Sequence, residues 1–585
     1  MSFDTLLVAN RGEIACRIIR TATAIGLRTV AVFSDPDRGS PHVGMADEAV
    51  HIGPAPARDS YLRAQALIDA ARSTGSGAVH PGYGLLSEDA AFARATEDAG
   101  LTFVGPTPRQ LELFGAKDSA RRLARDAGVP LAPGSEALSG TEEALEAAQR
   151  IGYPVMLKAT GGGGGIGLAP CHSSGELAEA FERVGRVAEA SFGRGGVFLE
   201  RYIEHGRHVE VQVFGDGEGH CLGLGDRDCT LQRRHQKVVE EAPAPALAEA
   251  VRERLAAWAT GLAEAVDYRS AGTVEFIYDP EREEAWFLEV NARLQVEHPV
   301  TEEVLGIDLV EWMLRLARGD ASMLDGDPPV PRGHAVEARV YAEDPANDHR
   351  PSAGLLTEVA LPAGVRIDGW VDAGTEVTAA YDPMLFKVIA SGPDRPTALD
   401  RLARALDETR VGGVATNLGL LRAALAHEAV RGAGHTTSTL GGVRDEEPRI
   451  DVMRAGTMTT VQDWPGRTGH WQVGVPPSGA MDDRSLRLGN LALGNREGAP
   501  GLECTLEGPA LRFSAATRIC ICGAEASVTV DGEPVPAWEP FEAPAQSTLD
   551  VGTPAQAGLR TYVLVAGGID VPDYLGSAAT FTLGG

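Results

Sequence analysis

The chain has 585 residues, too many for one hydrophobic core, so we expect three to five structural units. With 43% hydrophobic and 23% charged residues, it has the composition of a folded globular protein. The net charge of −29 argues against a nucleic-acid or anionic-membrane surface, although a local basic cleft or a bound metal still allows nucleotides as ligands.

No segment of the sequence has the pattern of a targeting or membrane segment. The apolar run from Leu6 to Ala9 is interrupted by Asn10 and Arg11 and has no basic region before it, unlike a signal peptide. No stretch approaches the roughly 18 apolar residues of a membrane helix. The seven cysteines have no repeating spacing, which is typical of buried thiols in a reducing compartment. We therefore expect a soluble cytoplasmic protein with neither a nucleic acid nor a membrane as partner.

The first elements form a strand-helix-strand unit. An apolar strand at 5–9, a helix at 12–25 and a strand at 28–33 predict a parallel sheet with a right-handed crossover. The turn at 10–13 lacks the glycine fingerprint of a dinucleotide site, so we do not expect a nicotinamide or flavin domain. Strands expected at 77–80 and 102–105 complete this unit.

Further changes of pattern divide the rest of the chain. A helix is expected at 118–127, followed by strands at 155–158, 196–200, 209–214, 272–278 and 286–290. After Gly333 the pattern is mostly antiparallel, and after 450 short β-type runs broken by Gly and Pro predict an all-β domain. The expected domains are 1–117, 118–332, 333–440, a linker at 441–450, and 451–585.

A row of polar residues alternates with apolar ones from Leu288 to Glu302. An extended strand would place five polar side chains on one face, namely Glu289, Asn291, Arg293, Gln295 and Glu297. Carboxylate and amide oxygens suit a hard divalent cation, and an arginine suits an oxyanion. Fully extended, the row would span roughly 26 Å, too long for one metal site, so we expect it to divide its residues between a metal side and an oxyanion side. Any turn within it would bring the two ends closer together. A half-exposed strand with cross-strand ion pairs is the alternative for this pattern alone.

Glycine-rich loops suggest phosphate contacts. The run at 161–165 directly follows a strand that ends in Lys158, and backbone N–H groups without a Cβ nearby can approach phosphate oxygens. It is not a P-loop, because no Gly-Lys-Ser/Thr follows. A flexible linker and a solvated lysine are the alternatives. The Gly- and Pro-containing loop at 80–88 would expose Tyr83 and Glu88 where α/β sheets bind ligands, unless it is a plain turn.

Two further segments carry polar groups. Residues 200–203 close an apolar strand, and Glu200 with the backbone beside it and Ile203 could line an adenine ring. The segment at 228–243 concentrates arginine, lysine, histidine and glutamate in an acidic protein. A solvated loop or a phosphate-facing cluster would both explain it.

The order of these segments resembles the biotin carboxylase family of ATP-grasp enzymes over about residues 1–440. The segments in chain order are Asn10–Ala15, the 80–88 loop, Lys117, Lys158 with the glycine run, Glu200, the 228–243 cluster, Glu275 and the 289–298 row. The resemblance implies an α/β architecture with a parallel-sheet N-terminal domain, a central ATP-grasp domain and an α+β C-terminal domain.

The resemblance also implies roles for particular residues. Metal ligands holding Mg–ATP (or the Mn²⁺ form) would be Glu275, Glu289 and Asn291. Nucleotide contacts would be Lys117, Lys158, Gly164, Gly165, Glu200, Ile203, His208, Gln232 and His235. The bicarbonate pocket would comprise Lys237, Arg293, Gln295, Val296 and Glu297. Biotin would meet Tyr83 and Arg339, and the catalytic groups would be Arg293, Glu297, Lys237 and Arg339.

The resemblance implies a reaction in two stages. Bicarbonate would attack the γ-phosphate of ATP to form carboxyphosphate, with Glu297 as general base and Lys237 and Arg293 stabilising the transferring phosphoryl group. Biotin N1′ would then be carboxylated, with Arg339 at the ureido oxygen. The glycine loop would lie on a mobile lid.

The tail resembles the carboxyltransferase domain of urea carboxylase. The motifs lie at 460–469, 474–483 and 487–495, and Ile166 and Leu168 also fit that branch better than the acyl-CoA branch. The sequence has no Ala-Met-Lys-Met biotinylation motif, and the tail stops inside the transferase module. We therefore expect the biotinylated carrier and the rest of the carboxyltransferase as partners outside this chain, through truncation, a split gene or a partial sequence. A homodimer is one possible assembly. Alternatives are an acyl-CoA carboxylase α subunit and a non-catalytic interaction protein.

Overall fold

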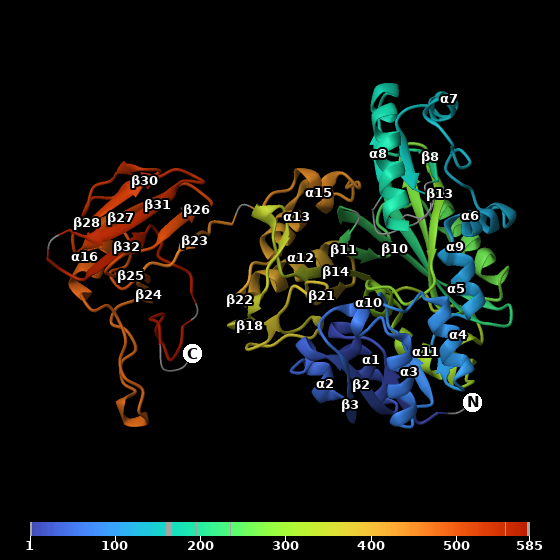
Figure 1. Ribbon diagram of the computed structural model, residues 1–585, viewed down its shortest axis with the longest axis horizontal. Coiled ribbons are helices and arrows are strands. Elements are labelled where there is room, and N and C mark those ends of the chain that lie inside the picture. The colour runs from blue at the N-terminus through green and yellow to red at the C-terminus, as the bar shows by residue number, and fades with distance from the viewer. Residues whose placement is uncertain are drawn as a thin grey trace. The chain divides into compact units, whose positions relative to one another are not determined.

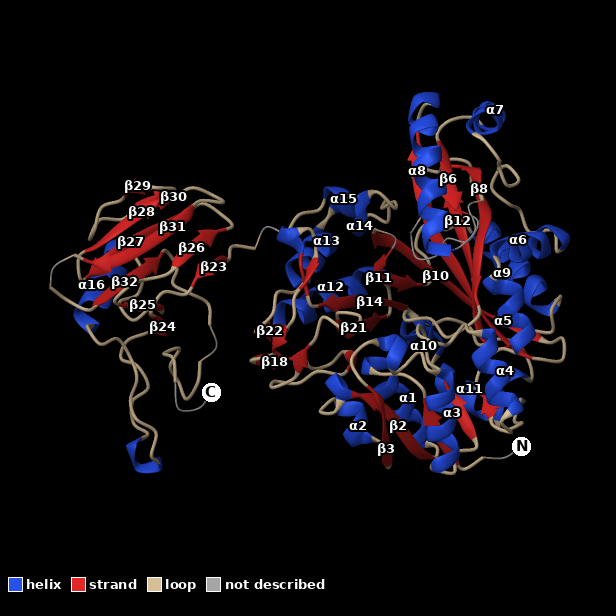
Figure 2. Cartoon of the chain, viewed as in Figure 1, coloured by secondary structure: helices blue, strands red, loops and turns tan. Residues whose placement is uncertain are grey.

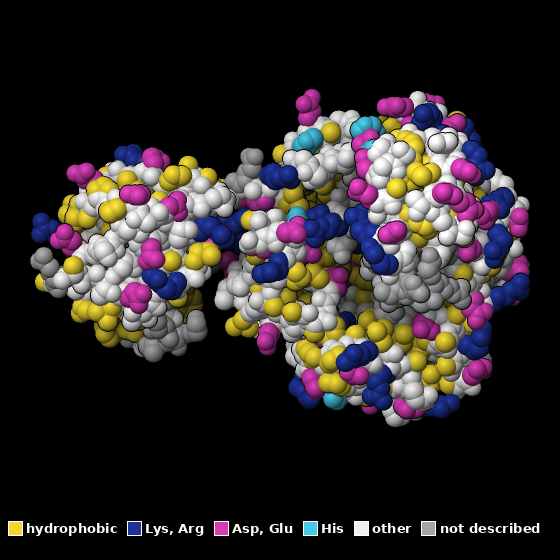
Figure 3. Space-filling model, turned by 45° about the horizontal axis from the view of Figure 1, so that its top comes forward, with side chains coloured by type: hydrophobic (Ala, Val, Ile, Leu, Met, Phe, Trp, Pro, Cys, Tyr) yellow, Lys and Arg dark blue, Asp and Glu magenta, His cyan; other side chains and the backbone are white. Residues whose placement is uncertain are grey.

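The computed structural model describes residues 3–159, 167–192, 196–234, 236–445, 447–555, 557–571 and 573–581, without the side chains of Lys117 and of residues 187–192. The chain divides into two compact units, Met1–Asp445 and Glu446–Gly585 (Figure 1). The division falls inside the expected linker at 441–450. On the face shown in Figure 3, acidic and basic side chains are interspersed with apolar ones.

The first unit begins with a five-stranded parallel sheet in the order β3-β2-β1-β4-β5. The strands are β1 (Thr5–Val8), β2 (Arg28–Ser34), β3 (Glu48–Gly53), β4 (Ala78–His80) and β5 (Thr102–Phe103), and helix α1 (Gly12–Ala24) forms the crossover from β1 to β2. The predicted parallel sheet is confirmed. Its strand order reverses between β1 and β4, so the 10–13 turn and the 80–88 loop meet at the edge where such sheets bind ligands.

A second sheet of eight strands forms the centre of the first unit, in the order β13-β12-β9-β10-β11-β14-β21-β19. Its strands are β9 (Arg207–Asp216), β10 (Cys221–Arg233), β11 (Gln236–Ala242), β12 (Arg269–Asp279), β13 (Glu284–Asn291), β14 (His334–Tyr341), β19 (Arg366–Gly369) and β21 (Met384–Gly392). Every neighbouring pair is antiparallel. Because β11 pairs with β14, the sheet continues across the expected boundary at 332/333 and joins ATP-grasp strands to C-terminal ones.

A small antiparallel sheet in the first unit has a separate hydrophobic core. It comprises β6 (Val155–Ala159), β7 (Leu168–Cys171) and β8 (Val197–Arg201), covered by α7 (Thr141–Ile151) and α8 (Ser174–Phe192) (Figure 1). Leu157, Leu177 and Leu199 are fully buried in that core. The glycine run at 161–165, with Gly164 and Gly165, and Ile166 lie outside the described residues.

The expected extended strand from Leu288 to Glu297 is wrong beyond Asn291. Strand β13 ends at Asn291, a turn follows, and helix α10 (His298–Leu305) begins at once. Pro299 at the start of α10 favours a helix there, because its fixed φ suits the first turn and its missing N–H is not needed. The alternation of polar and apolar residues therefore continues past Asn291, although the chain there is no longer a strand.

The second unit contains two five-stranded antiparallel sheets (Figure 2). One has the order β23-β26-β31-β28-β29 and the other β24-β25-β32-β27-β30. The strands are β23 (Ile450–Arg454), β24 (Met458–Gln462), β25 (Gly501–Thr505), β26 (Ala510–Phe513), β27 (Thr517–Gly523), β28 (Ala526–Val530), β29 (Glu533–Pro534), β30 (Phe541–Ala543), β31 (Thr548–Pro554) and β32 (Arg560–Val565). Leu511, Phe513 and Ile519 are fully buried between them.

Helix α16 (Asp483–Leu493) is an element of the second unit that the all-β prediction did not include. Leu486 and Leu493 pack against Cys520, Cys522 and Leu564 of strands β27 and β32. The sequence did contain its signals, because Asp482 caps the N-terminus by accepting from the Ser485 N–H and Gly494 ends the helix with φ 81°.

The described helices include none that is long and apolar enough to cross a membrane. All seven cysteines are buried and free, which agrees with their prediction as buried thiols.

Gly489 lets α16 approach its sheet. A Cβ at this position would lie 2.6 Å from both Cys522 Sγ and Leu564 Cδ1, inside van der Waals contact. We expect Gly489→Val to destabilise the second unit by about 2–3 kcal/mol, since overpacking a fitted contact costs more than it gains. Urea unfolding followed by tryptophan fluorescence measures this. Leu488→Val, at an exposed position of the same helix, should change stability little; equal losses in both variants would contradict the close contact.

Candidate active site

Lys237 on β11 joins three buried carboxylates from separate parts of the chain. Its Nζ lies 2.5 Å from Glu210 Oε2 on β9, 2.8 Å from Glu275 Oε1 on β12 and 2.5 Å from Glu297 Oε1 before α10. Glu210 and Glu297 have no exposed surface. The ammonium is therefore a common partner for groups that lie far apart in the sequence.

Burial and charge act in opposite directions on this cluster. Burial disfavours the Lys237 ammonium, but Glu210, Glu275 and Glu297 hold the pKa of Lys237 well above its usual range. Burial likewise disfavours the Glu297 carboxylate, yet Lys237 and Arg339 hold its pKa well below the usual range. Lys237 and Glu297 are therefore both ionised at neutral pH. The Lys237 ammonium can bind an anion, and the Glu297 carboxylate beside it can accept a proton.

The expected metal ligands lie together on β12 and β13. Glu275 and Glu289 are direct cross-strand neighbours, and Asn291 Nδ2 donates to Glu275 Oε1 at 2.8 Å. The structure adds His208 and Glu210 of β9, whose ligand atoms lie within 4.8 Å of one another and of Glu275. This donor set, mostly carboxylate and amide oxygens, fits Mg²⁺ or Mn²⁺.

The turn after β13 binds the rest of the polar row into one network. Arg293 donates to Glu88 Oε2 at 2.9 Å, to Gln295 Oε1 at 2.9 Å and to Asn291 Oδ1 at 3.0 Å. Gln295 Nε2 in turn donates to Glu275 Oε1 at 3.3 Å. The two ends of the row therefore meet around Glu275 and Lys237 instead of lying a strand length apart.

Arg339 on β14 lies beside Glu297 and a second buried carboxylate. Its Nη2 is 2.9 Å from Glu297 Oε2 and 2.6 Å from Glu240 Oε1. Glu240 faces Glu337 across the β11–β14 pair, and both are fully buried. Burial, opposed by Arg339, raises the pKa of Glu240 to about 7. Sequence reasoning did not select Glu240, although it lies in the 228–243 cluster.

The expected nucleotide contacts are partly engaged with protein groups. Glu200 on β8 forms ion pairs with Lys158 on β6 and with Arg121 on helix α6 (Lys117–Asp126), and it is buried. These pairs hold its carboxylate among cations instead of leaving it open to an adenine.

Of the remaining expected nucleotide contacts, some lie beside the metal ligands and others lie outside the described residues. Gln232 Nε2 lies 2.8 Å from His208 Nδ1, so these two meet beside the metal ligands, and Ile203 is half-buried just after β8. Gly164, Gly165 and His235 lie outside the described residues, and Lys117 begins α6 without a described side chain.

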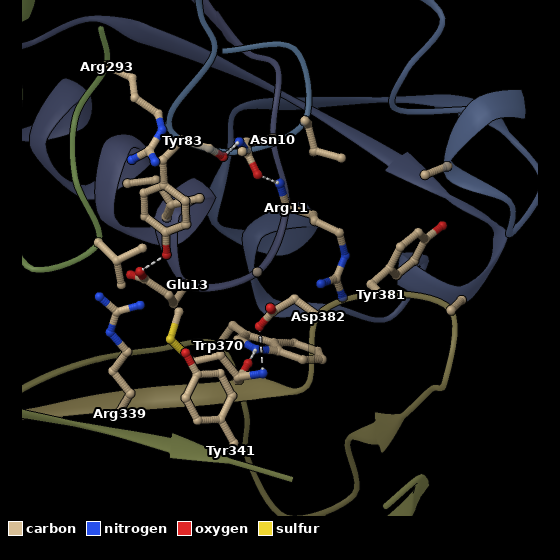
Figure 4. A pocket seen from close by; sticks show the side chains of 18 residues that line it. Asn10, Arg11, Glu13, Tyr83, Arg293, Arg339, Tyr341, Trp370, Tyr381 and Asp382 are labelled. Carbon is tan, nitrogen blue, oxygen red and sulfur yellow. Dashed lines mark hydrogen bonds between the residues drawn. The ribbon is translucent and has the colours of Figure 1, made fainter. Parts of the chain in front are cut away.

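A cavity of about 430 Å³ opens beside this cluster at the ligand edge of the parallel sheet (Figure 4). Its lining includes Tyr83 from the 80–88 loop, Arg293 and Val296 from the turn, and Arg339 from β14. Glu13, Trp370 and Tyr381 complete much of the wall. Tyr83 and Arg339, the two residues expected to meet biotin, therefore lie in one pocket.

Comparison with known families matches nearly the whole chain. Residues 2–111 match "Biotin carboxylase, N-terminal domain", 116–323 "Carbamoyl-phosphate synthase L chain, ATP binding domain", 337–441 "Biotin carboxylase C-terminal domain" and 473–585 "Carboxyltransferase domain, subdomain A and B".

Individual relatives agree with these matches. Biotin carboxylase of Halalkalibacterium halodurans is 47% identical over 74% of this chain and 97% of its own length. Urea amidolyase of Saccharomyces cerevisiae is 49% identical over 100% of this chain and 32% of its own. The chain spans 32% to 48% of the length of the urea-processing relatives that it matches over its whole length.

Solved structures show the same two levels of similarity. Kluyveromyces lactis urea carboxylase has a TM-score of 0.83 at 42% identity, over 99% of this chain and 45% of that one. The biotin carboxylase domain of Hydrogenobacter thermophilus 2-oxoglutarate carboxylase, a dimer in complex with MgADP, ADP and bicarbonate, has a TM-score of 0.72 at 41% identity, over 75% of this chain and 98% of that one.

The fold and the site thus define an ATP-dependent ligase of the ATP-grasp class. The chain belongs to the biotin carboxylase family, and its homologues along the whole length are urea amidolyases and urea carboxylases.

The raised pKa of Glu240 predicts a pH-dependent stability. The folded protein binds this proton more tightly than the unfolded chain, so the contribution is complete below about pH 4.5 and is lost as the pH rises through about 7. Glu240→Gln removes that loss, and we expect the variant to gain stability relative to wild type between pH 4.5 and 8 in urea unfolding. Glu297→Gln should behave oppositely, because the stabilisation from Glu297 is present above its unfolded pKa and lost in acid. A Glu240→Gln difference that does not change with pH would contradict the interpretation.

Proposed function

We propose that the first unit carboxylates biotin with ATP and bicarbonate and that the whole chain is the biotin carboxylase part of a urea carboxylase. The observation that supports this best is that the Lys237 ammonium contacts both Glu275 and Glu297. Glu275 belongs to the proposed metal site and Glu297 to the proposed bicarbonate site, so the two sites are adjacent at Lys237. Such a junction suits a reaction in which a phosphoryl group passes from a metal-bound nucleotide to bicarbonate.

In this proposal each residue has a role that its surroundings support. Glu297 is ionised and accepts the bicarbonate proton, because only an unprotonated carboxylate can act as base. Lys237 and Arg293 stabilise the charge on the transferring phosphoryl group. Bicarbonate, itself an anion, would displace part of the carboxylate contact with Lys237 and occupy the space beside Gln295 and Val296.

The metal and biotin sites are assigned on the same basis. Glu275, Glu289 and Asn291 would hold Mg²⁺ or Mn²⁺, which when bound neutralises nucleotide phosphates. ATP would contact the nine expected nucleotide residues, namely Lys117, Lys158, Gly164, Gly165, Glu200, Ile203, His208, Gln232 and His235. Because Glu200 is ion-paired with Lys158 and Arg121, nucleotide binding would exchange those pairs for contacts with adenine and phosphate.

Tyr83 and Arg339 would bind biotin, whose ureido nitrogen is the carboxyl acceptor. The Arg339 guanidinium, already 2.9 Å from Glu297, would donate to the ureido oxygen and stabilise negative charge there. Biotin would arrive on a carrier domain or protein. The dimer of the Hydrogenobacter thermophilus domain supports a homodimer as one possible assembly.

The acceptor proposal rests on the second unit and on similarity along the whole chain. Urea amidolyases and urea carboxylases match both units, whereas the biotin carboxylases that we compared match only the first. We therefore favour urea over guanidine, other amides and acyl-CoA as the carboxyl acceptor of the complete enzyme.

Glu297→Gln tests the chemistry of the first unit. We expect bicarbonate-dependent ADP release in the presence of free biotin to fall at least about 100-fold, because the neutral amide cannot take up the proton. A coupled assay of ADP measures this. Glu303→Gln, six residues further along the chain and within α10, where the side chain faces Arg366 and Ser391, is the matched control and should remain near wild type. Wild-type turnover in Glu297→Gln would show that the base is a different group.

Reconstitution tests the acceptor. Wild-type chain, ATP, bicarbonate, a biotinylated carrier and the remaining carboxyltransferase are combined with urea, guanidine or an acyl-CoA, and transfer of ¹⁴C from bicarbonate is followed. We expect urea to give the highest kcat/KM. Preference for an acyl-CoA would refute the assignment, and absence of any biotin-dependent ADP release by the chain would refute the carboxylase proposal itself.

A further inference from the structure

The turn that begins helix α1 holds Tyr83 at both ends. Asn10 Nδ2 donates to the Tyr83 carbonyl oxygen at 2.8 Å and to the Pro81 oxygen at 2.6 Å. The Tyr83 hydroxyl donates to Glu13 Oε1, and Figure 4 shows this bond at the wall of the cavity. The backbone anchor and the hydroxyl anchor come from one segment of four residues, so the position of the Tyr83 ring is fixed from outside its own loop.

Glu13 is buried with a cation on one side. It is 3% exposed, and its Oε1 lies 3.1 Å from Nζ of Lys387, which is fully buried and donates to the Val296 carbonyl at 2.7 Å. Burial raises the pKa of Glu13, and Lys387 opposes that rise. Among the described residues no donor binds Glu13 Oε2. The two neighbouring donors, the Tyr83 hydroxyl and the Lys387 ammonium, both meet Glu13 at Oε1, so this oxygen acts as an acceptor.

This fixes the direction of the Tyr83 hydroxyl. The Tyr83 hydroxyl donates its single proton to Glu13, so the phenol oxygen has only lone pairs to present elsewhere. Donation to a carboxylate also makes that oxygen a better acceptor, because successive hydrogen bonds polarise one another. Arg339 and Arg293 line the same cavity with donors. The pocket therefore combines several donors with the Tyr83 oxygen, an acceptor held in place by Glu13, and with the Asp382 carboxylate on another part of the wall.

A cyclic urea has the matching pattern, a carbonyl oxygen flanked by two N–H groups. Its oxygen suits Arg339. The nitrogen to be carboxylated must face the bicarbonate side, where Glu297 lies 2.9 Å from Arg339, so the other N–H is left for a different wall.

We propose that Glu13 is a positioning residue that fixes the Tyr83 hydroxyl as the acceptor for the N3′–H of biotin, so that the pocket selects ureido ligands with this N–H free. This inference rests on the proposed function and extends it, because it assigns a selectivity to the pocket and a residue that imposes it. Glu13 acts through Tyr83 and takes no part in the chemistry.

The test compares biotin with N3′-methylbiotin in wild type, Glu13→Gln, Tyr83→Phe and the double variant. The ratio of kcat/KM for the two ligands is measured by biotin-dependent ADP release. Wild type should prefer biotin by about 10- to 100-fold, the range expected for a hydrogen bond to a polarised oxygen. Each single variant should lose at least about fivefold of this preference, chiefly through KM for biotin. The double variant should lose no more than Tyr83→Phe alone, because the two residues act as one unit.

Several outcomes decide the inference. If Glu13→Gln keeps the wild-type preference, or if the two losses multiply, Glu13 does not act through Tyr83. If Tyr83→Phe keeps the preference, the methyl group is excluded by shape alone and the inference fails. Tyr381→Phe is the matched control, since it removes a hydroxyl of the same cavity that donates to the Ala55 carbonyl at 2.7 Å; it should keep the preference.

A second measurement tests the inference even if Glu13→Gln fails to fold, because it does not use that variant. With ¹⁵N-labelled biotin, the N3′ proton should move downfield on binding to wild type and return toward its free position in Tyr83→Phe. An unshifted proton in wild type overturns the inference. Active wild type without ligand preference refutes the inference alone, whereas wild type without biotin-dependent ADP release refutes the proposed function and, with it, the inference.

Discussion

The ammonium of Lys237 is the contact on which the rest of the site depends. Three carboxylates from β9, β12 and the turn before α10 meet at one Nζ within 2.8 Å. Without that charge, Glu210, Glu275 and Glu297 would repel one another in a buried space, where an unpaired carboxylate is costly. The cluster therefore holds the strands and the turn together only as long as cations and anions balance.

Nearby cations complete this balance. Arg227 is fully buried and donates to Glu210, Gln212 and Thr301, while Arg339 lies between Glu297 and Glu240. A buried ion network of this size is poor evidence for stability, because well-packed apolar residues would serve at least as well. It is better evidence for the proposed function, since a site meant to bind a metal, phosphate and bicarbonate needs charges that are already desolvated and oriented.

The same constraint connects the active-site cluster to the cavity. Val296 belongs to the turn, and its carbonyl accepts from Lys387, which also pairs with Glu13 at the cavity wall. Arg339 reaches both regions because the eight-stranded sheet runs unbroken from the ATP-grasp strands into β14 and β21. The cluster around Lys237 and the cavity thus share walls, which is what the proposed transfer of a short-lived carboxyl group between them requires.

Much of this could be predicted from the sequence, and the reason is local. Apolar runs and the helix between them predicted the parallel sheet, and the order of the motifs predicted the family, because both depend on residues that are neighbours along the chain.

Other features depend on distant residues. The polar row from Glu289 to Glu297 has the alternation of a strand, yet its second half turns because Lys237 and Arg339 draw Glu297 inward and α10 begins at His298. Helix α16 was hidden among β-type runs although its caps were visible. Glu240 and Glu13 lie in two of the segments that carry the family resemblance, but nothing in the sequence gives either residue a role of its own. Their environments arise only when β11 pairs with β14 and when the 10–13 turn meets the 80–88 loop. The sequence by itself therefore determined the types of chemistry and their order, whereas the tertiary structure decided which charges share one desolvated space, since that depends on pairing between strands far apart in the chain.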